Sequence, residues 1–241
     1  MVIVVVGART GYRIAGRSIS RETLTAGALA VAAGLVAFRR CWRWARIGIT
    51  AVHESGHAVA ALLVGRKVTA IHLRADTSGV TVHYGPAGRY RQLLTSAAGY
   101  PAPGAMGVAG AWLLEQRHLR LWLLALLLFG VVNLVLWVRN PFGLLVMVGW
   151  VAGLGWLIAR GTAGVEALVS AVAVWFLVLG GLRSAAESEW WRRGINRSAR
   201  RSDAADIAQL VHLPSRVCQA VFVVAAGAAV LAAGVLTVRT P

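Results

Sequence analysis

The chain has 241 residues, of which 58% are hydrophobic and 14% are charged, and its formal net charge is +16. A soluble globular domain carries about 25% charged residues, and the apolar residues here fall in long runs, so a soluble globular domain is excluded. The basic residues lie between these runs, where they set the orientation of membrane helices. The charge therefore indicates a protein in a lipid bilayer, with no nucleic-acid partner.

Seven apolar runs approach the length of a membrane helix, which needs about 20 residues with a range of about 17 to 25. The first is flanked by arginines, and we interpret it as a membrane anchor and not as a cleaved signal sequence. Pro101 and Pro103 interrupt the third, and Asn140-Pro141 closes the fourth. In chain order the runs are Thr23–Phe38, Ile47–Val64, Leu93–Leu114, Leu119–Val138, Phe142–Ala159, Val165–Leu182 and Val217–Val238.

Two stretches differ from the membrane runs. Residues Val68–Tyr84 alternate around an Asp-Thr-Ser-Gly turn sequence, which predicts a β-hairpin within an insertion at 66–92. Residues 183–216 are polar and basic and read as a loop, in which Ser202 fits a helix N-cap. We therefore predict an all-α polytopic membrane protein, one domain over residues 1–241, with about six to seven transmembrane helices and one small β-hairpin.

The arginines also predict an orientation. Most of them fall in segments that a cytoplasmic N-terminus would place inside the cell. The cluster at 39–46 argues against this orientation, because it would lie outside. Cys41 and Cys218 adjoin different apolar runs, and no framework of paired cysteines exists, so we expect no disulfide.

The second apolar run contains the sequence HExxH, from His53 through Glu54 to His57. Residues four apart on an α-helix share a face, about 6 Å apart along the axis, so both imidazoles can reach one zinc ion. Glu54 can then take a proton from the activated water as the general base. An ionisable group at this depth costs about 2.5 kcal/mol or more, which a divalent cation would compensate. The alternative is a polar interhelical network in a non-enzymatic transporter or scaffold.

Catalytic zinc usually has three protein ligands and a water, so one ligand must come from outside this motif. His72 and His83 fit the hairpin as ordinary strand residues, whereas His118 fits a solvated turn. The residues alone leave the third ligand open among His72, His83, His118, His212, Glu187, Glu189, Asp203 and Asp206.

The chain resembles the site-2 protease family of intramembrane zinc metallopeptidases, specifically its compact bacterial branch. The resembling segments are HExxH with Ala58, Gly79-Val80-Thr81-Val82, Ala97–Pro103 and Ser202-Asp203-Ala204, which arrive in the family's order. In that family a late aspartate, within a Leu-Asp-Gly motif preceded by Asn-Pro, supplies the third zinc ligand. This chain lacks that motif, so the resemblance carries the role to Asp203, with Asp206 as the alternative.

The resemblance implies a zinc endopeptidase of the bacterial cell membrane that cleaves a membrane protein in or near the bilayer, often a single-span substrate already trimmed. A strand edge of the hairpin would receive the unwound substrate, and the Pro-broken third run would open a path for water. A zinc hydrolase acting on a lipid or small molecule is the other enzymatic alternative. The expected substrate contacts are Gly79, Val80, Val82 and Tyr100. Asn140 is interpreted first as a helix boundary and second as a further substrate contact.

Overall fold

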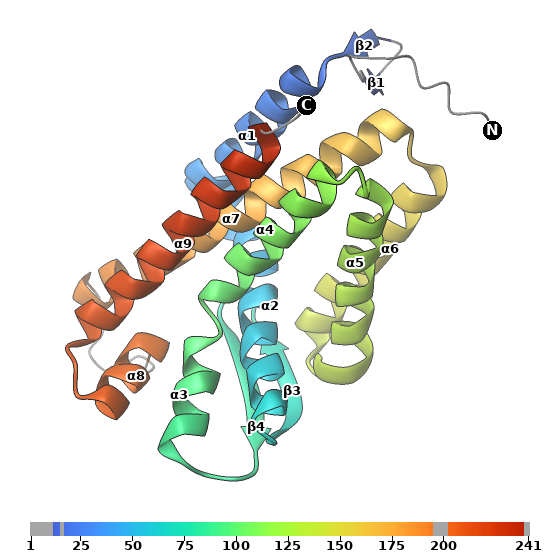
Figure 1. Cartoon of the computed structure of the whole chain (residues 1–241). Helices are drawn as coiled ribbons and strands as arrows, with labels where there is room; N and C mark the ends of the chain where they lie inside the picture. The colour runs from blue at the N-terminus through green and yellow to red at the C-terminus, as the bar shows by residue number, and fades with distance from the viewer. Residues whose placement is uncertain (1–11, 15–16, 195–201, 239–241) are drawn as a thin grey trace.

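The computed structural model describes residues 12–14, 17–194 and 202–238 (Figure 1). Helices dominate, as predicted. The described elements are β1 (Tyr12–Ile14), β2 (Arg17–Ile19), α1 (Arg21–Ala37), α2 (Arg39–Leu63), β3 (Lys67–Leu73), β4 (Gly79–Tyr84), α3 (Arg89–Ala97), α4 (Pro101–Glu115), α5 (Leu119–Val132), the π-helix η1 (Asn133–Trp137), α6 (Pro141–Arg160), α7 (Ala163–Gly194), α8 (Asp203–Val211) and α9 (Ser215–Val238).

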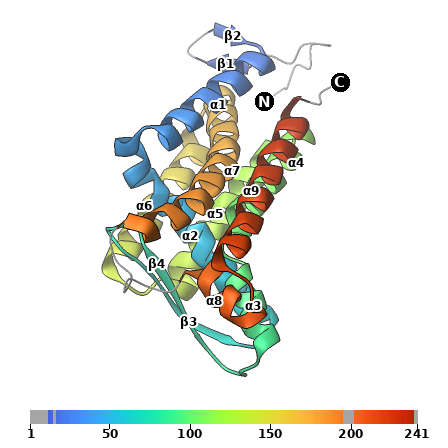
Figure 2. The ribbon, with the colours of Figure 1, turned by 90° about the vertical axis from the view of Figure 1, so that its left-hand side faces the viewer.

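Helix α7 is the centre of the helical bundle and contacts α1, α2, α4, α5 and α9. Figures 1 and 2 show α4, α7 and α9 running side by side along the molecule. Small residues allow this close packing, because a Cβ at Gly107 of α4 would lie 2.6 Å from Val178 of α7. Helix α2 therefore packs against an apolar core that is centred on α7.

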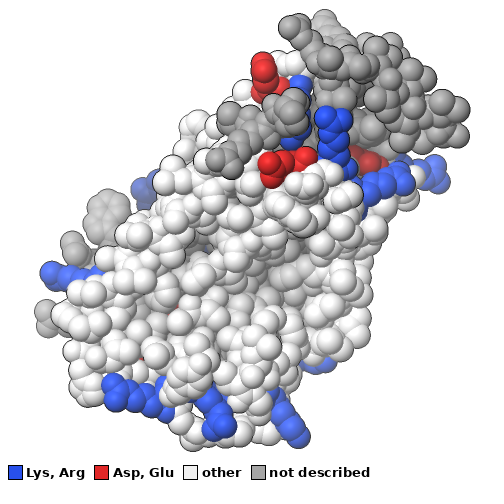
Figure 3. Space-filling view, viewed as in Figure 1, with Lys and Arg blue, Asp and Glu red and all other residues white. Residues whose placement is uncertain are grey.

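Four described helices are long and apolar enough to cross a bilayer, and they coincide with the last four predicted runs. Their ranges are Leu119–Trp137, Pro141–Arg160, Ala163–Glu187 and Ser215–Thr237. In Figure 3 the central area of the visible face carries no charged side chain, and most Lys and Arg lie towards its two ends. This distribution suits a bilayer around the middle of the protein.

Four to five candidate spans are found in the described residues, against the six to seven helices that the sequence predicted. Helices α1 and α2, which carry the first two runs, meet at an angle of 100°, and only together are they long and apolar enough for one span. The third run is divided: α3 ends at Ala97, and α4 begins at Pro101. Proline lacks a backbone N–H and suits the first position of a helix, so the chain restarts there.

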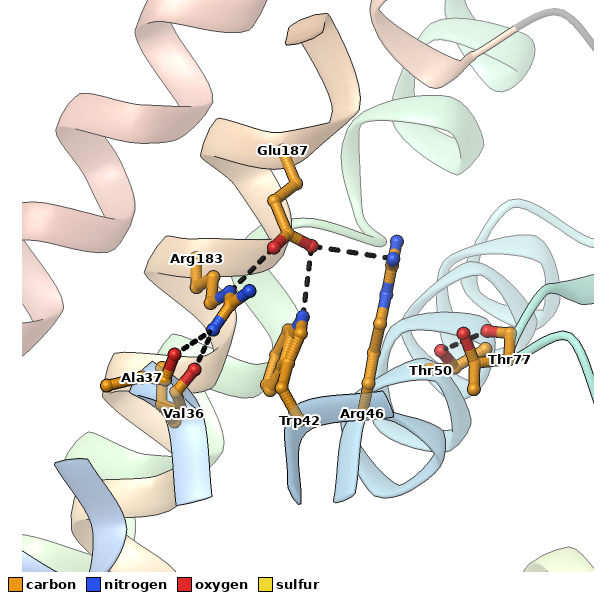
Figure 4. A network of polar contacts seen from close by, with 8 residues as sticks. All are labelled: Val36, Ala37, Trp42, Arg46, Thr50, Thr77, Arg183 and Glu187. Atoms are coloured by element: carbon orange, nitrogen blue, oxygen red, sulfur yellow. Dashed lines mark hydrogen bonds and ion pairs between the residues drawn. The ribbon is translucent and has the colours of Figure 1, made fainter. Parts of the chain in front are cut away.

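The elbow between α1 and α2 is held by side chains of α7 (Figure 4). Arg183 donates to the carbonyl oxygens of Val36 and Ala37, which end α1. Glu187 accepts a hydrogen bond from the Trp42 indole at 3.0 Å and forms ion pairs with Arg183 at 2.6 Å and Arg46 at 3.5 Å. The carbonyl oxygens at the end of α1 are thereby satisfied, and the start of α2 is anchored on α7.

The predicted hairpin is present as the antiparallel pair β3–β4, with one irregularity in register between Val68 and Ala70. Its turn is closed by Ser78, whose backbone N–H and hydroxyl both donate to the Asp76 carboxylate. These bonds lower the pKa of Asp76. Ile71 of β3 also forms an isolated parallel bridge with Val138. A second short pair, β1 with β2, precedes α1 and was not predicted.

The described part of segment 183–216 is mainly helical and not a loop. Residues 183–194 continue α7, and Ser202 is the N-cap of α8, as its sequence predicted. Ala204 and Ile207 of α8 are buried against α9 and α3, in a cluster with Phe222. Cys41 and Cys218 are both free, the first exposed and the second buried.

Candidate metal centre

The HExxH motif lies in the second half of α2, as predicted, and one face of the helix presents both histidines. Gly56, inside the motif, lies against the break between α3 and α4: a Cβ there would be 2.6 Å from the Ala98 carbonyl oxygen. Only glycine permits this approach, which brings the break within reach of the histidines.

Three donor atoms meet beside α2. His53 Nε2 lies 3.1 Å from His57 Nε2 and 3.1 Å from Asp203 Oδ2, and the distance from His57 Nε2 to Asp203 Oδ2 is 3.3 Å. Zinc bonds of about 2.0–2.1 Å at tetrahedral angles would place neighbouring donors about 3.3–3.4 Å apart. The triangle of two imidazole nitrogens and one carboxylate oxygen therefore has the composition and size to hold a zinc-like ion.

The break between α3 and α4 fixes the orientation of these rings. His57 Nδ1 lies 2.7 Å from the carbonyl oxygen of Thr95, to which it donates, so that Nε2 is free to act as a ligand. A Cβ at Gly99 would lie 2.6 Å from His53 Cε1 and from His57 Cε1. Tyr100 packs edge-on against the His53 ring. The broken third run thus forms a wall of the site.

Asp203 reaches the histidines from α8, where it is the first helical residue after the Ser202 cap. The Ser202 hydroxyl accepts the backbone N–H of Ala205 at 3.3 Å. Burial by itself raises the pKa of the Asp203 carboxyl, but its close contacts with the imidazole rings of His53 and His57 outweigh burial, and the pKa lies well below its usual value. The carboxylate is therefore ionised, which is the form that binds a cation.

Glu54 points from α2 towards β4. The hydroxyl group of Thr81 donates to Glu54 Oε2, at 2.7 Å, and to the backbone carbonyl oxygen of Glu54, at 2.9 Å. A Cβ at Gly79 would lie 2.6 Å from Glu54 Oε1, so the start of β4 packs directly on the carboxylate. The side chain is 7% exposed and is held next to the donor triangle.

A cavity of about 590 Å³ joins these groups. Of the expected substrate contacts, Gly79, Val80 and Tyr100 line it, together with His53, Glu54, His57 and Asp203. Val82 is 43% exposed on the other side of β4 and does not line it. Asn140 lies outside it as well: its side-chain amide binds the N–H and the carbonyl of Leu73 on β3, at 3.0 and 2.6 Å.

The other candidates for a third ligand lie apart from the triangle. Asp206 and His83 line the same cavity, but their donor atoms are outside the described three-residue cluster. Glu187 belongs to the α1–α2 elbow, and His212, the C-cap of α8, lies 3.3 Å from Arg89. His72 pairs with Val80 across the hairpin, His118 is the N-cap of α5, and the side chain of Glu189 lies outside the described residues.

Thr81, Thr95 and Gly99 were not among the predicted site residues. Thr81 has a weak signal in the sequence, because it is two residues from Gly79 on a predicted strand and shares its face. Thr95 acts through its backbone carbonyl, which any residue provides. Gly99 lies beside the prolines of the third run, but no pattern in the sequence places it against two imidazoles.

The comparison with protein families finds one match: a family described as Peptidase M50B-like covers residues 26–233. No curated protein and no solved structure shows a significant match. The matched range contains α2, the hairpin, the α3–α4 break and α8, and therefore every residue of the donor triangle.

Proposed function

The chain belongs to the Peptidase M50B-like family, and on that premise we propose that it is an intramembrane zinc metalloendopeptidase. We place it in a bacterial cell membrane as a multi-pass protein with a cytoplasmic N-terminus. Its substrates are membrane proteins with a single span, cleaved in or near the bilayer after earlier trimming.

The observation that carries this proposal is the spacing of the donor triangle, 3.1, 3.1 and 3.3 Å between its ligand atoms. We assign His53, His57 and Asp203 as the zinc ligands. A zinc ion held there would polarise the scissile carbonyl and lower the pKa of water. The ion would also compensate the charge of Asp203 and the burial of polar groups in an apolar helix.

Glu54 is the general base of the proposed reaction. It takes a proton from the attacking water and passes it to the nitrogen of the leaving peptide. The Thr81 hydroxyl orients the carboxylate through its bond to Oε2 and leaves Oε1 on the side of Gly79. The water reaches Glu54 through the cavity bordered by Tyr100 and Thr95, at the broken third run.

Substrate binding is proposed at the edge of β4. In the described residues β4 pairs only with β3, and the outer edge of β3 is occupied by Val138 and by the Asn140 amide. An unwound segment of substrate that adds to β4 as a strand would run past Gly79 and Val80, which line the cavity. Its peptide bonds would then be extended and accessible beside Glu54.

The test compares wild type with Glu54→Gln, and with Glu22→Gln at an exposed position of α1 as the matched control. Purified wild type should contain one zinc per chain and cleave members of a library of single-span substrates in detergent. Glu54→Gln should keep its zinc and its fold, and its kcat should fall by about 10²- to 10⁴-fold. Full cleavage by this variant would exclude Glu54 as the base, and a wild type without zinc or cleavage would favour a non-enzymatic membrane protein.

A further inference from the structure

His83 is a polar residue that lines the cavity and has no role in the reaction as described above. It lies on β4 two residues after Thr81, and alternate residues of a strand point to the same face. The surroundings of these residues follow this alternation. Thr81 contacts Glu54, Val82 is 43% exposed, and His83 lines the cavity. One strand thus presents Gly79, Thr81 and His83 in succession towards the catalytic groups.

The ring of His83 has one nitrogen sealed inside the protein. Its Nδ1 is buried and has no hydrogen-bond partner among the described residues. Burial lowers the pKa of His83, and the positive charge of Arg66 lowers it further, so the ring is neutral at physiological pH. A proton on Nδ1 would be a buried orphan donor, which proteins avoid more strictly than an orphan acceptor. The favoured tautomer therefore carries its proton on Nε2, the nitrogen that remains available to the cavity.

A donor of this kind would add to the polarisation of the scissile carbonyl by the metal. As the water oxygen bonds to the carbonyl carbon, the π electrons of the C=O bond move to its oxygen. The C–N bond then breaks, and the nitrogen receives the proton that Glu54 took from the water. Glu54 and Asp203 are acceptors when ionised, so neither can donate to the developing oxyanion. Donors placed at such an oxygen are among the strongest contributions to catalysis.

We propose that His83 is a catalytic residue that donates a hydrogen bond from Nε2 to the carbonyl oxygen of the scissile peptide as that oxygen becomes negatively charged. This inference rests on the proposed endopeptidase function. His83 is not a metal ligand in this assignment, because the described donor cluster consists of His53, His57 and Asp203.

The experiment replaces His83 by Phe, which keeps a ring and removes the donor, and by Gln, which restores a neutral donor. The control is His72→Phe, at the other histidine of the hairpin, which does not line the cavity. His83→Phe should lower kcat by about 10²- to 10³-fold, with KM within about twofold and zinc unchanged. His83→Gln should recover part of the loss, and His72→Phe should behave as wild type.

A second readout separates this role from substrate docking. A phosphinic peptide has a tetrahedral centre with a charged oxygen, so its affinity should fall in His83→Phe by a factor similar to the fall in kcat, because it mimics the transition state. If His83→Phe does not fold, His83→Leu replaces it in both measurements.

Three outcomes would overturn the inference: an unchanged kcat, a loss of zinc, or a rise in KM alone. The proposed function is tested separately, since it depends on zinc in the wild type and on the loss of activity in Glu54→Gln.

Discussion

The hydroxyl oxygen of Thr81 lies 2.7 Å from Glu54 Oε2 and 2.9 Å from the carbonyl oxygen of the same residue. A hydroxyl has one hydrogen, so this donor is shared between the side chain and the backbone of Glu54. The contact joins β4 to the second residue of the HExxH motif. The orientation of the carboxylate is therefore set by a strand that is 27 residues away in the chain.

Replacement of Thr81 by Val keeps the shape of the side chain and removes the donor. We expect kcat to fall by about 10- to 100-fold, because hydrogen bonds to charged groups contribute about 1.5–3 kcal/mol. Zinc content should not change, since Thr81 does not contact the donor triangle. Thr81→Ser should restore most of the activity. Equal activity of the Val and Ser variants, measured as kcat on one substrate, would show that the contact does not position the base.

Two glycines should separate metal binding from catalysis. Gly99→Ala places a methyl group within 2.6 Å of both histidine rings, so zinc affinity should fall by about 10- to 100-fold, as for other residues that support ligands. Gly79→Ala instead meets the Glu54 carboxylate, so activity should fall while zinc is retained. Gly149→Ala in α6, where nothing lies within 4 Å, is the control. Competition with a chromogenic chelator measures the affinity, and unaltered affinity in Gly99→Ala would contradict the ligand geometry.

The third ligand is tested by comparing the two aspartates of α8. Asp203→Ala should lose stoichiometric zinc and all activity, since only two ligands remain. Asp206→Ala should keep zinc, because Asp206 lines the cavity outside the donor cluster. Metal analysis of the purified variants gives the answer directly. The reverse pattern, with zinc lost only in Asp206→Ala, would show that the third ligand is Asp206, about one helical turn further along α8.

The elbow between α1 and α2 should contribute to stability more than to chemistry. Glu187→Gln weakens the ion pairs with Arg46 and Arg183, and we expect a loss of about 1.5–3 kcal/mol in unfolding free energy, the range for hydrogen bonds to charged groups. Thermal unfolding in detergent, followed by circular dichroism, measures the change. Glu22→Gln, at an exposed position, should unfold as the wild type does. An unaltered midpoint in Glu187→Gln would mean that apolar packing alone holds the bend.

Local patterns in the sequence determined much of this protein. Apolar length and the placement of arginine indicated membrane helices, and the four runs from Leu119 onwards appear as candidate spans. Alternation around a turn sequence predicted the β3–β4 hairpin. The spacing of HExxH predicted that His53 and His57 share a face, because the helical period fixes this relationship without any other part of the chain.

Relationships between distant segments were decided only by the tertiary structure. The residues alone left Asp203 and Asp206 both open, and only the resemblance ranked Asp203 first. In the structure Ala204 and Ile207, buried against α9 and α3, fix the orientation of α8 that brings Asp203 to the histidines. The 100° bend is contacted by Arg183 and Glu187, which lie far along the chain from Phe38. The contact of Thr81 with Glu54 and the place of His83 in the cavity likewise require the hairpin to be docked on α2. Sequence periodicity fixes which side chains share a face, whereas packing fixes what each face meets.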